Sequence, residues 1–600
     1  MRKGIYSLCL LLAVFLTGPA SATELSEVSS LARTGATELA LGLMDRHQPA
    51  LEEDPVAWMR WERERLHLYR GRQLWAAMDE RVAGYPDHAP VEFSRWARTQ
   101  QVQALLALGR PEDARTVLRG LIWSAESLPE AHFRAWRQLI IESQLEAGDA
   151  DAARIALRRF RQDYQDNDGE TRVIEARLYL QEGQGIDAMR ALQELPQDQY
   201  RPLRLLAHLQ LDPDAAGEVL TRAIELGFDN EAAIADRRMA WSVASLAARE
   251  TGNRSARVGA LERGLGHRSD ESRADPIFRL RPDMLWEAYH EYGRQLGNEA
   301  RILVGDDPMW FELAESYAVE EPVKARAVLS VTAFRSFEEA ARAQAHEWLV
   351  DSLSGERHGP DLIRRLYLES DHFPAIEDIP LPVRYRLADL ALNEADIPLA
   401  SQLMSELTEP PQGADAQDWG LRRARVLLLG GQREEGLLAL ERVLLDTDAE
   451  SGDEEDGVDT LEVGRFLQVV FDLQNMNDHE PAMDFLRRLM DRDLEGQQHR
   501  EILFWAAESA EGMDDPVEAA RLYLRSAGFH DAFSMDQWAQ TARYRAADAL
   551  ADAGMTEDAQ RLYRSLLNAT DEEARRAVLR NRIQRLQIMS TEVGSDASEP

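Results

Sequence analysis

The chain has 600 residues and is strongly acidic, with 106 Asp and Glu against 69 Lys and Arg and a formal net charge of −37. A surface of that sign repels nucleic acid and anionic lipid, so the composition argues against nucleic acid as a partner. After the first residues no apolar run approaches the about 18 residues that a bilayer crossing requires. No transmembrane segment is therefore expected in the mature chain.

Residues 1–22 have the pattern of a secretory signal peptide. Arg2 and Lys3 precede a largely apolar run of 12 residues, which is shorter than the about 20 needed to span a bilayer. The small residues Ala20-Ser21-Ala22 then form a cleavage site, so we expect the mature chain to begin at Thr23. This pattern predicts export to the periplasm, with secretion as the alternative.

The remaining chain reads as one apolar-striped helix after another, and no strand-like alternation of useful length occurs. Several helix pairs share a turn in which a glycine is followed five residues later by a buried-type alanine. These pairs are Gly109 with Ala114, Gly148 with Ala153, Gly183 with Ala188 and Gly554 with Ala559. The first three glycines are spaced by 39 and 35 residues. Because one hairpin cannot cover its own apolar face, the pattern predicts a stack of hairpins.

These turns resemble those of tetratricopeptide repeats, whose unit is about 34 residues long. The resemblance is degenerate, since other apolar residues replace most of the family's large first-helix positions. It implies an all-α solenoid of antiparallel helix hairpins, a superhelix whose concave groove binds proteins or peptides. It brings no catalytic residues with it.

The expected organisation follows the strength of this pattern. The signal peptide is followed by tetratricopeptide-like repeats over 23–267 and by a divergent helical-repeat segment over 268–410. A second set of repeats covers 411–589 and contains an acidic loop at 446–459, which has eight acidic residues and no basic one. Residues 590–600 are short and polar, and we expect a disordered tail.

A search for catalytic motifs finds none. The only cysteine, Cys9, lies in the signal peptide, which excludes a thiol nucleophile and a thiolate metal site from the mature chain. Lys324 is the only lysine of the mature chain, and Val323 before it rules out a phosphate-binding P-loop. We therefore expect no catalytic, cofactor-binding or metal-binding residues, and no enzyme.

Three patterns bear on metal binding. His346-Glu347 begins a zinc motif, but Val350 stands where the second histidine belongs. Glu-x-x-His occurs three times, and we expect a solenoid to keep these motifs apart, which excludes a di-iron site. The three motifs are Glu64 with His67, Glu287 with His290, and Glu369 with His372. The acidic loop lacks the glycine and glutamate spacing of an EF-hand.

The chain's 13 tryptophans allow two interpretations. Trp58, Trp61, Trp75, Trp310 and Trp348 either fill the core between hairpins or stack on a ligand. Core filling is the simpler interpretation, because large aromatics commonly pack between repeated helices.

The sequence leaves two functions open. The first is a non-catalytic periplasmic scaffold that binds envelope proteins or peptides in its concave groove. The second is a cell-wall or exopolysaccharide handling protein, either a glycan binder or an accessory to export or peptidoglycan processing. A purely structural spacer is a third and weaker possibility.

Overall fold

The computed structural model describes residues 25, 28, 31, 32 and 37–596, apart from 125–128, 165–168, 268–275, 303, 454–462, 493, 530 and 532. The expected signal peptide lies outside this part of the chain and stays a prediction. All regular elements of the described residues are helices, which confirms the all-α expectation. None of the helices in these ranges has the length and apolar character required to cross a membrane.

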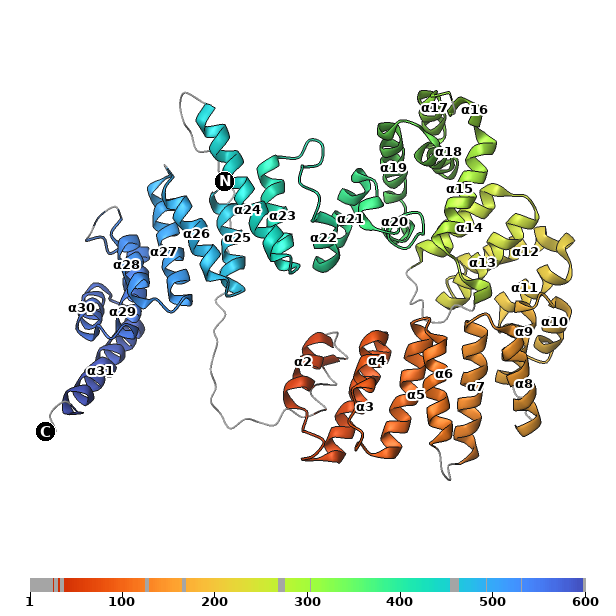
Figure 1. The fold of residues 1–600 in the computed structure, drawn as a ribbon, viewed down its shortest axis with the longest axis horizontal. Coiled ribbons are helices and arrows are strands. Elements are labelled where there is room, and N and C mark those ends of the chain that lie inside the picture. Colours follow the sequence, from red (N-terminus) through yellow and green to blue (C-terminus); the bar gives the residue numbers. More distant parts are fainter. Residues whose placement is uncertain are drawn as a thin grey trace. The chain divides into compact units, whose positions relative to one another are not determined.

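The chain divides into two compact units (Figure 1). The N-terminal unit comprises Met1–Glu338 and Asp351–His372, and the C-terminal unit comprises Glu339–Val350 and Phe373–Pro600. Helix α19 (Glu339–Ser354) contributes residues to both units. The expected segment boundaries at 267 and 410 remain predictions.

Paired helices make up most of the N-terminal unit. They are α2 (Thr37–His47), α3 (Pro55–Gly71), α4 (Trp75–Ala83), α5 (Val91–Ala107), α6 (Pro111–Trp123), α7 (Glu130–Glu146), α8 (Ala150–Tyr164), α9 (Gly169–Gln181), α10 (Gly185–Gln193), α11 (Arg201–Leu211), α12 (Ala216–Phe228), α13 (Ile234–Glu250), α14 (Arg254–Gly266), α15 (Pro282–Leu296), α16 (Glu299–Ile302), α17 (Asp307–Tyr317), α18 (Pro322–Arg335) and α20 (Gly359–Leu368). Short 3₁₀ turns lie at η1 (Pro213–Ala215) and η2 (Pro276–Phe278).

The C-terminal unit continues the same pattern. After η3 (Ile376–Asp378) come α21 (Leu381–Asn393), α22 (Ile397–Met404), α23 (Ala416–Leu429), α24 (Arg433–Asp453), α25 (Val463–Asn475), α26 (His479–Met490), α27 (Gly496–Gly512), α28 (Pro516–Ala527), α29 (Gln537–Asp552), α30 (Thr556–Ala569) and α31 (Glu573–Asp596).

Each unit contains a row of stacked hairpins. Most helices pack on the next one in sequence, and in several hairpins the first helix also packs on the first helix of the following hairpin. We call these the first helices and their partners the second helices. Examples of first-helix contacts are α5 with α7 and α7 with α9 in the N-terminal unit, and α23 with α25 in the C-terminal unit. This packing agrees with the hairpin stack expected from the sequence.

The glycine and alanine signature takes up the expected positions. Gly109, Gly148, Gly183 and Gly554 all have a positive φ, from 68° to 76°. A side chain with a Cβ rarely adopts this conformation, so glycine ends each first helix without strain. The alanines that follow, Ala114, Ala153, Ala188 and Ala559, are fully buried. Their small side chains allow the second helix to approach the core closely.

The end of the N-terminal unit departs from simple stacking. Helix α15 packs mainly on α18 and also contacts α20, which in turn contacts α14. The buried Arg326 of α18 reaches back to Glu262 of α14 with two contacts, Nη2 to Oε2 at 2.6 Å and Nε to Oε1 at 2.8 Å. These four helices therefore form a local bundle rather than two successive hairpins.

Two local expectations are wrong. Residues 446–453 of the expected acidic loop belong to α24, and residues 454–462 lie outside the described part of the chain. The helix continues because Thr447 is buried one turn beyond Val443 and donates its hydroxyl to the Val443 carbonyl. Residues 590–596 of the expected disordered tail are the last turns of α31, where no proline interrupts the helix.

Candidate binding pocket

The tryptophans singled out by the sequence lie mainly in the core. Trp58, Trp61 and Trp310 are buried, so the core interpretation is confirmed for these three. Trp75 and Trp348 are half-buried.

Lys324 does not have the environment that Schiff-base chemistry requires. Its ammonium lies 2.6 Å from a Glu321 carboxylate oxygen and 5.1 Å from the centroid of the Tyr317 ring. The hydrogen bond to Glu321 raises the pKa of Lys324 above its usual value. A nucleophilic lysine needs the opposite shift, because only the neutral amine attacks a carbonyl.

The structure brings two of the Glu-x-x-His motifs together. The rings of His290 and His372 lie 5.2 and 5.1 Å from the ring of Phe334 on α18. The expectation that these motifs stay apart is therefore wrong for this pair, because α15 packs on α18 and also contacts α20, the helix just before Glu369. Among the described residues no group of three or more His, Cys, Asp or Glu is arranged to hold a metal ion.

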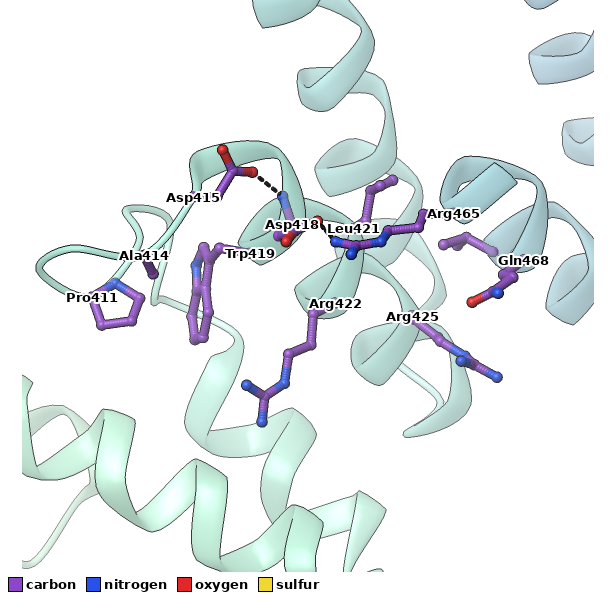
Figure 2. Close-up of a pocket in the computed structure, with 11 residues that line it drawn as sticks. Pro411, Ala414, Asp415, Asp418, Trp419, Leu421, Arg422, Arg425, Arg465 and Gln468 are labelled. Atoms are coloured by element: carbon purple, nitrogen blue, oxygen red, sulfur yellow. Dashed lines mark hydrogen bonds and ion pairs between the residues drawn. The ribbon is translucent and has the colours of Figure 1, made fainter. Parts of the chain in front are cut away.

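The row of first helices in the C-terminal unit contains a solvent-open pocket of about 500 Å³ (Figure 2). We call it the arginine pocket. Its walls come from α23, α25 and the loop before α23. The lining residues are Pro411, Ala414, Asp415, Asp418, Trp419, Leu421, Arg422, Arg425, Arg465, Gln468 and Val469.

Trp419 is the main apolar wall of the arginine pocket. Its side chain is buried, and its indole Nε1 donates to the Leu407 carbonyl at 3.3 Å. The Tyr385 ring meets it edge-on, with 5.3 Å between ring centroids. At the start of α23 the Asp415 carboxylate accepts from the backbone N–H of Asp418 at 2.8 Å, which caps the helix. One hydrogen bond and one ring contact therefore fix the Trp419 side chain, which lies in the first turn of a capped helix.

Three arginines line the pocket beside this apolar wall, and each forms an ion pair with a neighbouring first helix. Arg422 contacts Asp389 of α21 at 2.7 Å, Arg425 contacts Asp472 of α25 at 2.6 Å, and Arg465 of α25 contacts Asp418 of α23. The side chains of Arg422, Arg425 and Arg465 remain 48%, 48% and 52% exposed. About half of each side chain therefore remains accessible to a partner.

The N-terminal unit has a related pocket between the first helices α5 and α7, with a volume of about 520 Å³. Trp136 donates its indole Nε1 to the Thr99 hydroxyl at 3.0 Å, and the Arg63 guanidinium lies 5.2 Å from the centroid of the Trp96 ring. The lining residues are Glu92, Arg95, Trp96, Thr99, Pro129, Ala131, His132, Ala135 and Trp136. This tryptophan pocket and the arginine pocket occupy the same kind of position, between successive first helices.

The sequence predicts a concave groove, but it does not identify the residues that line the arginine pocket or the tryptophan pocket. A periodic signal was present for the tryptophan pocket: Trp58, Trp96 and Trp136 are spaced by 38 and 40 residues, close to the spacing of the turn glycines. No comparable repetition marks Arg422, Arg425 and Arg465. The arginine pocket depends on which helices become neighbours.

No protein-family model matches this chain, and no curated protein matches its sequence. Among solved structures, the chain is similar to the crystal structure of yeast Tom70, at 11% identity and a TM-score of 0.22, over 84% of this chain and 97% of that one. It is also similar to a circular tandem repeat protein with novel repeat topology, at 13% identity and a TM-score of 0.10, over 95% and 96% of the two chains.

Proposed function

We propose that the chain is a non-catalytic scaffold that binds segments of other proteins along its rows of first helices. The observation that carries the proposal is the arginine pocket. A buried tryptophan wall lies beside three half-exposed guanidinium groups, and aromatic and arginine side chains dominate the energetics of protein interfaces. Stacked helical hairpins in general present such first-helix surfaces to extended partners.

The partner surface is well suited to a mixed polar and apolar peptide. Arg422 and Arg425 each contact an aspartate through one nitrogen, and their other N–H donors match carboxylate or backbone carbonyl oxygens. Trp419 and Leu421 line the pocket but are only 6% and 4% exposed, so the guanidinium groups supply most of the accessible contact. Because the aspartate partners hold the guanidinium groups in place, binding of a peptide would cost these arginine side chains little additional conformational entropy.

We also propose that the scaffold acts in the periplasm of a bacterial cell envelope and that its partners are envelope proteins or peptides. This proposal is supported only by the signal-peptide pattern of residues 1–22. Amino-terminal sequencing of the protein recovered from the periplasmic fraction tests it, and we expect the chain to start at Thr23. An intact amino terminus on a cytosolic protein would contradict export.

The two pockets give less support to the glycan-handling function than to the scaffold function. Sugar binding usually uses an open aromatic face, but Trp419 is buried and the Trp96 ring has the Arg63 guanidinium over it. Incubation with peptidoglycan and with neutral and acidic polysaccharides distinguishes the two functions. We expect no retention and no turnover of any of these polymers.

Site-specific photo-cross-linking tests the scaffold function. Gln468 is exposed and lines the arginine pocket, so a photoreactive residue there should trap a protein partner in cells. Glu557 is exposed on the second helix α30 and serves as the matched position outside the pocket. Trapping from Gln468 but not from Glu557 supports the proposal, and equal trapping or none from both positions contradicts it.

A further inference from the structure

A second groove lies on the second helices of the same hairpins. It is lined by α24 and α26, has a volume of about 540 Å³ and is open to solvent. We call it the leucine groove. On α24 its lining residues are Glu434, Leu437, Leu438 and Glu441, and on α26 they are Glu480, Pro481, Asp484, Phe485 and Arg488.

The floor of the leucine groove is apolar and partly uncovered. Phe485 is buried in the core beneath it and Leu437 is half-buried. Leu438 is 64% exposed. Leaving a leucine in water forgoes the free energy of burying it, so a side chain placed over this floor would be stabilised by contact with Leu438.

The rim of the groove carries four carboxylates and one guanidinium. The guanidinium, that of Arg488, already contacts Glu441 at 3.3 Å. Glu434 and Glu480 form no ion pair within the described residues. Their neighbour Arg433 is engaged with both carboxylate oxygens of Asp478. Asp484 pairs with Arg487 at 3.6 Å, and Arg433 offsets part of the charge of Glu434 and Glu480. The groove therefore keeps two carboxylates without a direct ion pair, Glu434 and Glu480, beside an apolar floor.

We propose that the leucine groove binds a basic, amphipathic helix of a partner protein, with large apolar residues on one face and lysine or arginine on the other. The apolar residues would cover Leu437 and Leu438, and the cations would lie against Glu434 and Glu480. This site is distinct from the arginine pocket, which lies on the first helices. A scaffold with both sites can hold two partners on opposite sides of the same pair of hairpins.

Binding of a helical peptide with leucines on one face and lysines on the other tests the proposal. Two control peptides replace its leucines by serine or its lysines by glutamate, and fluorescence anisotropy of the full chain measures each affinity. We expect the leucine–lysine peptide to bind at least about tenfold more tightly than either control, because both the floor and the rim contribute.

Two pairs of variants distinguish the groove from general attraction to an acidic protein. Glu434→Lys changes the rim, while Glu435→Lys makes the same charge change at the exposed neighbouring residue outside the groove. Leu438→Ala removes the exposed leucine, while Leu445→Ala removes a second exposed leucine of α24 that does not line the groove. We expect each groove variant to weaken binding about tenfold and each control variant to leave it within about twofold.

Three results would overturn the proposal. The first is equal weakening by Glu434→Lys and Glu435→Lys, which would indicate attraction to the net charge alone. The second is binding of the serine peptide as tightly as the leucine–lysine peptide, or no binding of either. The third is a dimer of the full chain in light scattering that Leu438→Ala dissociates, since a second copy would then occupy the groove.

Discussion

Arg425 of α23 and Asp472 of α25 join two successive first helices through an Nε to Oδ2 contact of 2.6 Å. Arg465 and Asp418 join the same two helices in the opposite direction. These crossed ion pairs hold the walls of the arginine pocket together. The pocket is thereby pre-organised by the same groups that a partner would contact.

Arg425→Ala should weaken partner capture without unfolding the protein. An exposed ion pair contributes only about 0–1 kcal/mol to stability, so the midpoint of thermal unfolding should change little. The matched control is Arg545→Ala, which removes a similar pair between the first helices α29 and α27. Cross-linking yield from Gln468 is the readout. A yield reduced equally by both variants would show that the pocket is not the binding site.

Gly148→Ala should destabilise the N-terminal unit, because its φ of 74° is strained for any residue with a Cβ. We expect a cost of about 1 kcal/mol. Gly120 lies within α6 with open space around its missing Cβ. Gly120→Ala should therefore stabilise the protein by about 0.5–1 kcal/mol. Thermal unfolding of both variants measures the difference, and shifts of the same sign would contradict this account of the turn.

Arg326→Met should destabilise the N-terminal unit by about 3–5 kcal/mol, because it leaves the Glu262 carboxylate in the core without its counter-ion. Arg326 is only 1% exposed, and Glu262 also accepts from the Tyr289 hydroxyl at 2.6 Å. The double variant Arg326→Met with Glu262→Leu should recover most of this loss. Denaturant unfolding of the two single variants and the double variant measures the coupling. A double variant no more stable than Arg326→Met would contradict this account of the buried ion pair between Arg326 and Glu262.

His346 should make stability fall as the pH drops below 6.5. Burial lowers the pKa of His346 from 6.5 to about 3. Between these values the unfolded chain binds a proton that the native chain does not, so acid favours unfolding. At pH 5 this contribution amounts to about 2 kcal/mol relative to pH 7. His346→Gln removes this contribution. The difference in unfolding free energy between wild type and variant should therefore change by about 2 kcal/mol between pH 7 and pH 5. A difference that is independent of pH would contradict the assignment.

Local patterns predicted much of the fold. Gly148 and Ala153 indicate the turn and the close approach of two helices because both requirements are met within one hairpin. The sequence does not predict the full length of α24, because the like-charged acidic residues after Leu445 favour a solvated loop. Thr447, which is buried against the core, could have indicated the extra turn.

Contacts between distant segments could not be predicted in this way. Glu262 and Arg326 are separated by 64 residues, and no local periodicity indicates that α14 and α18 meet. The same holds for His290 and His372, which both pack on Phe334. The arginine pocket is an intermediate case. Its tryptophan lies on a predictable helix, but the pairing of Arg422 with Asp389 depends on how successive hairpins stack.

The most direct measurement is hydrogen–deuterium exchange of the full chain, alone and with the partner trapped from Gln468. The account predicts slower exchange in the first helices around the arginine pocket, over 416–429 and 463–475. Exchange in α30 should not change. Protection confined to α30 and α31, or no protection anywhere, would contradict the claim that the first helices bind the partner.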